Sequence, residues 1–340
     1  MEPVARLPAT MLLPRPVHRE TLRSGWSSGH AMPLGALLCG SLPWMCSKEP
    51  RAARAGRFAR LKFNERIRAV QKYTHGEMSE EFDTGVSTGY QSLDEYFRPV
   101  RGEVITLSGQ PGSGKSEFVL SMALNIAERK AWKIGLCLFE HKADQLFLQL
   151  LEKRKRMNFN DLDSLSMEDE KSWLTQHFQS MTDFSEEMDL DQILERAERL
   201  AEDGNLQMLI IDPYNYIAQP PGLGKEILET HLVSTYMTKL QQFAKKYKVC
   251  VLVVVHPTKQ SQIAGGDPSL YDMQGSANWY NKCDKGLILR RANRDPDAGS
   301  THEVEIYIKK VRNGDSGKVG MTKLEFQPKT RCYKEIYVAV

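Results

Sequence analysis

The strongest constraint on this chain is the stretch GQPGSGKS, which begins at Gly109 and has the spacing G-x-x-x-x-G-K-S. Its glycines allow a tight turn whose backbone N–H groups point inward at an anion. The lysine and hydroxyl that end it are the groups with which a phosphate-binding loop reaches the β- and γ-phosphates and holds Mg²⁺. A glycine-rich turn between core elements is the alternative, but packing supplies no reason for a Lys-Ser pair there. The residues expected to bind ATP are Gly109, Gln110, Pro111, Gly112, Ser113, Gly114, Lys115 and Ser116.

The flanks of this loop predict a strand before it and a helix after it. Residues 104–107 read VITL, a short apolar run typical of a buried strand. After the loop, Phe118, Met122 and Ile126 recur at helical spacing up to about residue 130. A helix that begins near Lys115 directs the positive end of its dipole at the same anion.

Apolar runs alternate with amphipathic patterns along the rest of the chain. We expect strands at about 133–139, 208–212, 249–255, 286–291, 303–309 and 323–326, with an edge hairpin at the end. We expect helices at about 144–157, from 166, 190–201 and 228–247. Runs as apolar as 249–255 are typical of strands buried on both faces. The alternation therefore predicts an α/β fold with a mostly parallel, twisted sheet flanked by helices.

Composition divides the chain into three parts. Residues 1–62 hold ten Lys and Arg against three Asp and Glu, whereas the remaining 278 residues hold 36 against 40. Rich in Arg, Pro, Gly and Ser, segment 1–62 is expected to be a disordered extension; it suits an organelle transit peptide, with a plain disordered tail or a mis-set start as alternatives. Residues 63–84 are expected to be a linker with a charged helix, which docks on a neighbouring subunit or caps its own domain. The globular domain then takes 85–340.

Charge, cysteine spacing and hydropathy argue against a broadly basic nucleic-acid-binding surface, a cysteine zinc site and a membrane span. Because the folded part is not broadly basic, any nucleic acid must be gripped by a local basic loop. The six cysteines form no C-x-x-C pair and no zinc spacing, and Cys137, Cys250 and Cys283 lie in or beside apolar runs, which indicates buried thiols in a reducing compartment. No window approaches 18 uninterrupted apolar residues, so no membrane span is expected.

A polar or charged residue follows each of four predicted strands, and in open α/β sheets ligands bind at that edge. Ser116 and Asp212 are expected to hold Mg²⁺, the carboxylate through water. Glu140 is expected to orient or deprotonate the attacking water, with a helix N-terminal acid as the alternative. His256 is expected to contact the γ-phosphate, with a surface histidine as the alternative.

These motifs occur in an order that resembles one known family. They are GVSTG at 85–89, the GQPGSGKS loop, Glu140, IDPYN at 211–215, VHP at 255–257, YDMQGSA at 271–277, NKCD at 281–284 and KVRN at 310–313. Over roughly residues 85–327 the chain resembles the helicase domain of the Twinkle family of RecA-like, DnaB-like ring helicases. The resemblance implies a RecA-like P-loop NTPase fold. It also implies a hexameric or heptameric motor that uses ATP and Mg²⁺ to move 5′ to 3′ along single-stranded DNA in the replication of a mitochondrion or plastid.

The resemblance also implies a role for particular residues. Glu140 would be the catalytic base and His256 the γ-phosphate sensor, while Lys115, Ser116 and Asp212 would bind MgATP. Arg312, with Lys310 beside it, would reach into the ATP site of the neighbouring subunit. Arg291 would lie near the nucleotide base, although an inserted residue around 290–293 departs from the family pattern. The residues expected to hold DNA are Lys259, Gln274, Gly275, Ser276 and Asn278, and Trp279 and Tyr280 would either stack on bases or pack in the core.

Two departures from the family pattern narrow the expected activity. Only about 85 residues precede the motor, so no primase-like domain and no priming are expected, and Gln274 stands where a basic residue can occur. The expected partners are single-stranded DNA, further copies of the chain, a replication polymerase and a single-strand binding protein. The rival hypotheses are a RecA-like DNA-binding ATPase switch or recombination mediator that does not unwind, and a non-catalytic subunit that joins rings.

Overall fold

The fold is described by a computed structural model for residues 84–140, 143–158, 167–182, 187–219, 229–258, 273, 277–291 and 302–336. The predictions for the extension over 1–62 and for the helix over 63–82 lie outside these residues. So do the predictions for Lys259, Gln274, Gly275 and Ser276.

Within the described residues, one sheet has the strand order β3-β2-β4-β5-β1-β6-β7-β8-β9. The strands are β1 Val104–Ser108, β2 Ile134–Leu138, β3 Phe178–Ser180, β4 Met208–Asp212, β5 Cys250–Val255, β6 Lys285–Arg291, β7 Glu303–Val311, β8 Gly320–Gln327 and β9 Cys332–Glu335. From β3 to β6 neighbouring strands pair parallel, and from β6 to β9 they pair antiparallel. The prediction of a mostly parallel sheet that ends in an edge hairpin is confirmed.

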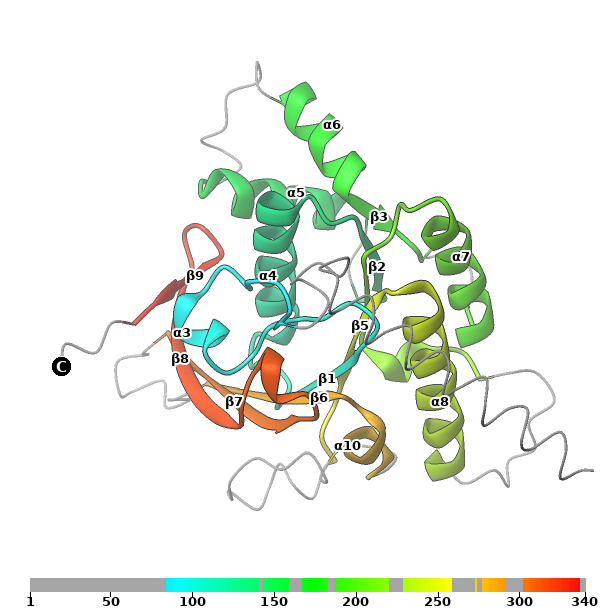
Figure 1. Cartoon of the computed structure of the whole chain (residues 1–340). Helices are drawn as coiled ribbons and strands as arrows, with labels where there is room; N and C mark the ends of the chain where they lie inside the picture. The colour runs from blue at the N-terminus through cyan, green and yellow to red at the C-terminus, as the bar shows by residue number, and fades with distance from the viewer. Residues whose placement is uncertain are drawn as a thin grey trace, which may run out of the picture. The chain divides into compact units, whose positions relative to one another are not determined.

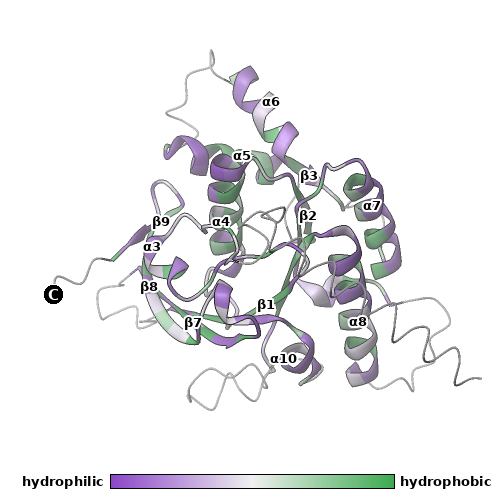
Figure 2. Ribbon diagram, in the orientation of Figure 1, coloured by the Kyte–Doolittle hydropathy of each residue, from purple (hydrophilic) through white to green (hydrophobic). Residues whose placement is uncertain are grey.

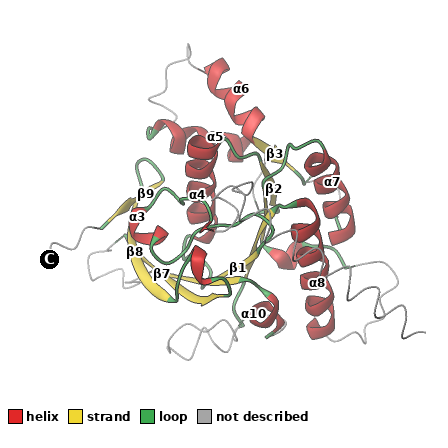
Figure 3. Cartoon of the chain, in the orientation of Figure 1, coloured by secondary structure: helices red, strands yellow, loops and turns green. Residues whose placement is uncertain are grey.

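Helices cover both faces of this sheet (Figure 1; Figure 3). They are α3 Gln91–Asp94, α4 Lys115–Lys130, α5 Ala143–Lys155, α6 Met167–His177, α7 Leu190–Glu202, α8 Glu229–Tyr247 and α10 Asn278–Lys282, with 3-10 turns η3 Tyr214–Tyr216 and η5 Gly314–Ser316. One core lies between the sheet and α4, α5 and α6, and a second lies between its other face and α7, α8 and α10. Successive strand residues alternate between the two cores, as Val104 and Ile105 do, because side chains of a strand point to opposite faces.

Local chemistry explains why these segments take their conformations. Every residue of β1, β2, β4 and β5 is buried, which matches their unbroken apolar runs (Figure 2). The amphipathic helix α7 begins at a capping box: the Asp189 carboxylate accepts from the Gln192 N–H at 2.9 Å, and the Gln192 side chain accepts from the Asp189 N–H at 2.9 Å.

The strands at the two edges differ most from the prediction. β3 was not expected, the last strand of the edge hairpin, β9, had no predicted bounds, and the last long strands run to Val311 and Gln327, past their apolar runs. Edge strands form through backbone hydrogen bonds and tolerate polar side chains, so apolar runs do not mark their ends. Cys137, Cys250 and Cys283 are buried, as predicted. Among the described helices, none is long and apolar enough to cross a membrane.

Candidate nucleotide site

The loop between β1 and α4 takes a backbone path that requires glycine. Gly109, Gly112 and Gly114 have φ values of 156°, 70° and 92°. A Cβ on Gly109 would lie 2.3 Å from the Leu289 carbonyl oxygen of β6, so no larger residue fits between the loop and that strand. The sheet therefore holds the start of the loop tightly against β6.

Lys115 turns its charge back toward the loop. Its ammonium donates to the carbonyls of Gly109 at 2.8 Å and Gln110 at 3.1 Å, and the residue is only 6% exposed. Ser116 follows in the first turn of α4, where the helix dipole presents its positive end. The donor chemistry fits an anion with several oxygens, because a buried ammonium, a hydroxyl and a helix N-terminus meet at one loop.

Three other predicted site residues gather at the same edge of the sheet. Asp212 is the last residue of β4, nearly buried, and His256 directly follows β5. Strand register aligns these ends, since Val255 lies opposite Ser108, the residue before the loop. Glu140 follows β2, whose Leu138 lies opposite Asp212. The predicted gathering at the carboxyl ends of parallel strands is what the structure contains.

The electrostatics of His256 reflect this proximity. Burial and the Lys115 ammonium lower the pKa of His256, and the Glu140 carboxylate opposes them. The imidazole is therefore neutral at pH 7. A neutral imidazole donates from one ring nitrogen and accepts at the other, so it can bind a phosphate oxygen without adding charge.

A pocket of about 450 Å³ opens beside the loop, and six of its ten lining residues were not predicted. It is lined by Gly112, Ser113, Gly114, Glu117, Arg291, Val304, Phe326, Pro328, Arg331 and Tyr333. Arg291 thus lies beside the phosphate loop despite the insertion near it. The Tyr333 hydroxyl donates to the Gly114 carbonyl at 3.2 Å, and its ring meets Phe118 edge to face at 5.9 Å. No motif marks Phe326, Arg331 or Tyr333; the predicted hairpin was the one signal that pointed to this part of the chain.

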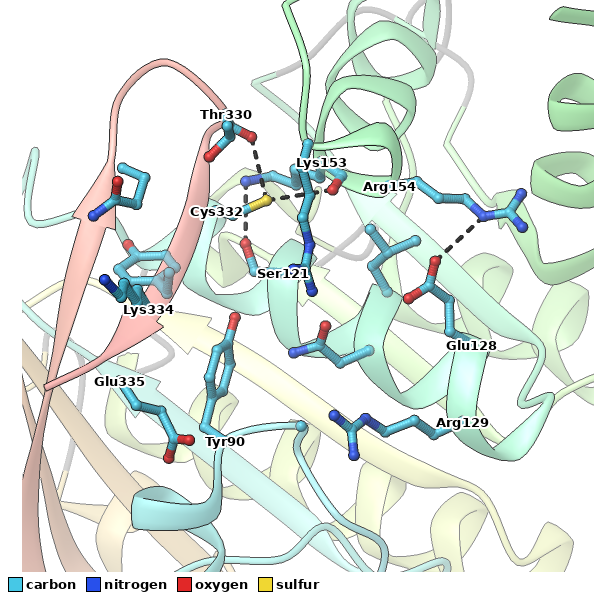
Figure 4. Close-up of a pocket in the computed structure, with 16 residues that line it drawn as sticks. Tyr90, Ser121, Glu128, Arg129, Lys153, Arg154, Thr330, Cys332, Lys334 and Glu335 are labelled. Atoms are coloured by element: carbon cyan, nitrogen blue, oxygen red, sulfur yellow. Dashed lines mark hydrogen bonds and ion pairs between the residues drawn. The ribbon is translucent and has the colours of Figure 1, made fainter. Parts of the chain in front are cut away.

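A buried ion network fixes that hairpin to the first turn of α4. The Lys153 ammonium donates to Glu117 Oε2 at 2.5 Å, to Ser121 Oγ at 3.1 Å and to the Arg331 carbonyl, while the Arg331 guanidinium pairs with Glu117. Burial raises the pKa of Glu117, but the two cations outweigh it and lower the pKa overall. Figure 4 shows Lys153 in the wall of a second pocket of about 430 Å³, which shares Tyr333 with the first. The network therefore holds the hairpin side chains over the loop.

Arg312 and Lys310 lie at the opposite end of the sheet. Arg312 Nη1 donates to Asp284 Oδ1 at 2.8 Å, and the Asp284 N–H donates to the Val104 carbonyl at the start of β1. The phosphate loop begins at the other end of this five-residue strand, about 16 Å away at ~3.3 Å per residue. Within its own protomer, Arg312 is therefore remote from Lys115.

The short helix α10 carries the one predicted DNA-contacting residue that the structure describes. Asn278 begins this helix, and its amide donates to the Thr230 carbonyl at 3.2 Å. Trp279 is fully buried and meets Tyr214 edge to face at 4.5 Å, so the core alternative is right for this ring. Tyr280 is partly buried, with the Lys310 ammonium 4.8 Å from its ring centre.

A glycine-rich phosphate loop at the carboxyl edge of a parallel sheet, flanked by helices on both faces, defines a RecA-like P-loop NTPase fold. The family model "DnaB-like helicase C terminal domain" matches residues 85–335, and the chain belongs to this family.

Relatives and solved structures agree with this family. The chain is 36% identical over 293 residues to the "Twinkle homolog protein, chloroplastic/mitochondrial" of Arabidopsis thaliana, covering 82% of this chain and 40% of that protein. It is 26% identical to "Replicative DNA helicase DnaB" of Geobacillus stearothermophilus, covering 74% and 58%. The chain thus spans between two fifths and three fifths of these relatives. The solved "ATPase Domain of G40P" has the same fold, with a TM-score of 0.66 at 19% identity, over 80% of this chain and 98% of that one.

Proposed function

We propose that this chain is the motor of a ring-shaped DNA helicase. It hydrolyses ATP at the interfaces between subunits and uses the energy to move 5′ to 3′ along single-stranded DNA. The observation that carries the proposal is the distance between the two halves of the site: the phosphate loop lies at one end of β1 and Arg312 at the other. A protomer that presents a nucleotide cradle and an arginine at opposite ends completes its site only with a second copy.

Within one protomer, the loop N–H groups and Lys115 would grip the triphosphate. Ser116 and Asp212 would hold Mg²⁺, which when bound neutralises the charge that develops on the phosphoryl oxygens. Glu140 would take the proton of the attacking water, because it is exposed at the edge where the γ-phosphate would lie. His256, neutral beside Lys115, would sense the γ-phosphate by hydrogen bonding to it.

Arg312 would supply the charge that its neighbour's site lacks. A planar guanidinium suits the charge that spreads over a transferred phosphoryl group, and such an arginine contributes about 10³–10⁵ in rate. Lys310 stands two residues earlier, near the end of β7, and would support it. Arg291 and the hairpin pocket would enclose the nucleotide base.

The DNA and the cellular setting complete the proposal. The phosphates of one DNA strand would be contacted, without reading of its sequence, by Asn278 together with Lys259, Gln274, Gly275 and Ser276. Replication is the expected setting because relatives are described as replicative helicases, and an organelle is expected because one relative is described as chloroplastic/mitochondrial. The acid-poor residues 1–62 suit a transit peptide to either organelle. Further copies of the chain in a six- or seven-membered ring, a polymerase and a single-strand binding protein would be the partners.

The test is ATP turnover with and without single-stranded DNA, followed by unwinding of a forked duplex. Single-stranded DNA should raise turnover, and Lys115→Ala should abolish it at every DNA concentration. If ATP turnover does not change with DNA, translocation is contradicted and the switch hypothesis is favoured. If wild-type protein shows no ATP turnover, the hypothesis of a non-catalytic ring subunit is favoured.

The interface role needs its own experiment. Arg312→Ala and Lys115→Ala should each lack turnover alone and regain it when mixed, because some interfaces then combine an intact phosphate loop with an intact Arg312. Arg199→Ala, which removes an exposed arginine of α7, is the matched control and should leave turnover unchanged. Mass photometry should show rings at the concentration used for the ATPase assay. A protein that stays monomeric while it hydrolyses ATP at the full rate would contradict the interface mechanism.

A further inference from the structure

Among the described residues, the Arg312 side chain is held by Asp284 and Asn281. Its Nη1 donates to Asp284 Oδ1 at 2.8 Å and its Nη2 to the Asn281 carbonyl at 3.3 Å. Its backbone N–H also donates to the Asp284 carbonyl at 2.9 Å. Nevertheless the Arg312 side chain is 47% exposed. A guanidinium has five N–H donors, so this arrangement leaves donors directed at the surrounding solvent.

Asp284, in contrast, is fixed in place. Its side chain is only 8% exposed, and its second oxygen accepts from the Val104 N–H at 2.9 Å. The Asp284 N–H donates in turn to the Val104 carbonyl at 2.8 Å. The carboxylate is therefore bound to the first residue of β1, the strand that leads to the phosphate loop.

The end of α10 provides the rest of the support. The Lys310 ammonium donates to the carbonyls of Tyr280 at 2.5 Å and Asn281 at 3.1 Å, where a helix C-terminus favours cations. Helix α10 is itself fastened to α8, since the Lys282 ammonium donates to the carbonyl and hydroxyl of Ser234 and to the Thr238 hydroxyl at 2.7–2.8 Å. The last carbonyls of α10 therefore bind the side chains of both Lys310 and Arg312, and α10 is itself bound to α8.

We propose that Asp284 is a positioning residue, which together with the last carbonyls of α10 sets the Arg312 guanidinium in the orientation required at the next subunit's nucleotide. The inference rests on the proposed role of Arg312 in trans. Rate enhancement by a charged group depends on its being oriented before the reaction begins, because reorientation during the reaction costs free energy. A long exposed arginine without Asp284 would sample many rotamers and lose this advantage.

Asp284→Asn tests this directly. An amide presents one acceptor oxygen where the carboxylate presents two, so it keeps the Val104 N–H only by turning its NH₂ group toward Arg312. We expect kcat for DNA-stimulated ATP hydrolysis to fall about 100-fold, as for a misplaced catalytic group. KM for ATP should stay within about twofold, because the phosphate loop that binds ATP is unchanged. In an Arg312→Ala background, Asp284→Asn should cause no further loss, whereas a second large loss would overturn the proposal.

Mixed rings separate positioning from a structural role. Lys115→Ala subunits cannot bind ATP but keep a competent Arg312, and Asp284→Asn subunits have the opposite defect. Mixing the two defective proteins should raise turnover above that of either alone, because some interfaces then combine an intact loop with a well-held arginine. Arg312→Ala mixed with Lys115→Ala is the reference. Recovery in the reference but not with Asp284→Asn overturns this inference alone; recovery in neither overturns the interface mechanism on which it rests.

A folding defect is controlled by a second variant. Asp284→Glu keeps the charge but moves the carboxylate by one methylene, and it should lower kcat less than Asp284→Asn and be rescued by the same mixing. Melting temperatures of both variants are measured beside wild type. Wild-type kcat in either correctly folded variant would overturn the proposal.

Discussion

Lys285, the first residue of β6, is a fully buried lysine, and its replacement should be among the most damaging single changes in the described domain. Its ammonium lies 2.6 Å from Glu103 Oε2, donates to the Arg98 carbonyl at 2.6 Å and stands 5.9 Å from the centre of the Phe97 ring. Burial lowers the pKa of Lys285 and raises the pKa of Glu103, and each charge opposes the shift of the other.

Lys285→Met should cost about 3–5 kcal/mol of unfolding free energy, because it leaves the Glu103 carboxylate buried without its cation. For a domain of this size, that corresponds to a melting temperature lower by roughly 6–20 °C. In the variant, the pKa of Glu103 rises further above its unfolded value. Stability is then greatest below the unfolded pKa and is lost as pH rises through the folded one, so the defect should be larger at pH 8 than at pH 5.

The assay is urea and thermal unfolding at both pH values. Arg199→Met is the control, because its partner Glu195 lies one helical turn away and both side chains are more than 60% exposed; it should cost at most about 0.5 kcal/mol. The double variant Lys285→Met/Glu103→Leu should recover most of the loss, since no isolated charge remains. Equal losses in Lys285→Met and Arg199→Met, or no recovery in the double variant, would refute the reasoning.

Two further predictions concern the nucleotide site. Gly109→Ala should weaken binding of a fluorescent ATP analogue more than tenfold, because its Cβ would meet the Leu289 carbonyl. Gly204→Ala is the control: it is also at positive φ but has nothing near its Cβ, so it should leave binding unchanged and cost at most about 1–3 kcal/mol of unfolding free energy. Equal binding by both variants would contradict the steric argument. His256 has a lowered pKa, so the folded state binds fewer protons and loses stability as pH falls below about 6.5. In melts between pH 7 and 5, His256→Asn should therefore lose less stability than wild type, and parallel losses would contradict this.

The buried parallel strands could be predicted from sequence because burial on both faces leaves an unbroken apolar run. The residues after these strands could be placed as well. Parallel strands end at one edge of the sheet, so the ends of the predicted strands put Asp212 and His256 at that edge. The edge strand β3 and the bounds of β9 could not be predicted, since short polar edge strands are defined by backbone pairing with a neighbouring strand. Arg331 and Tyr333 could not be assigned to the pocket because they lie more than 200 positions from the loop that they face.

The sequence alone determined that this chain has a phosphate loop, because a turn of that shape needs glycine at fixed positions and a lysine at its end. It also determined the class of sheet, because hydrophobic periodicity is a local property. Only the tertiary structure decided that Arg312 stands at the far end of β1 from that loop, held by Asp284. Positions at opposite ends of a strand are set by pairing between distant segments, and no local pattern of residues encodes them.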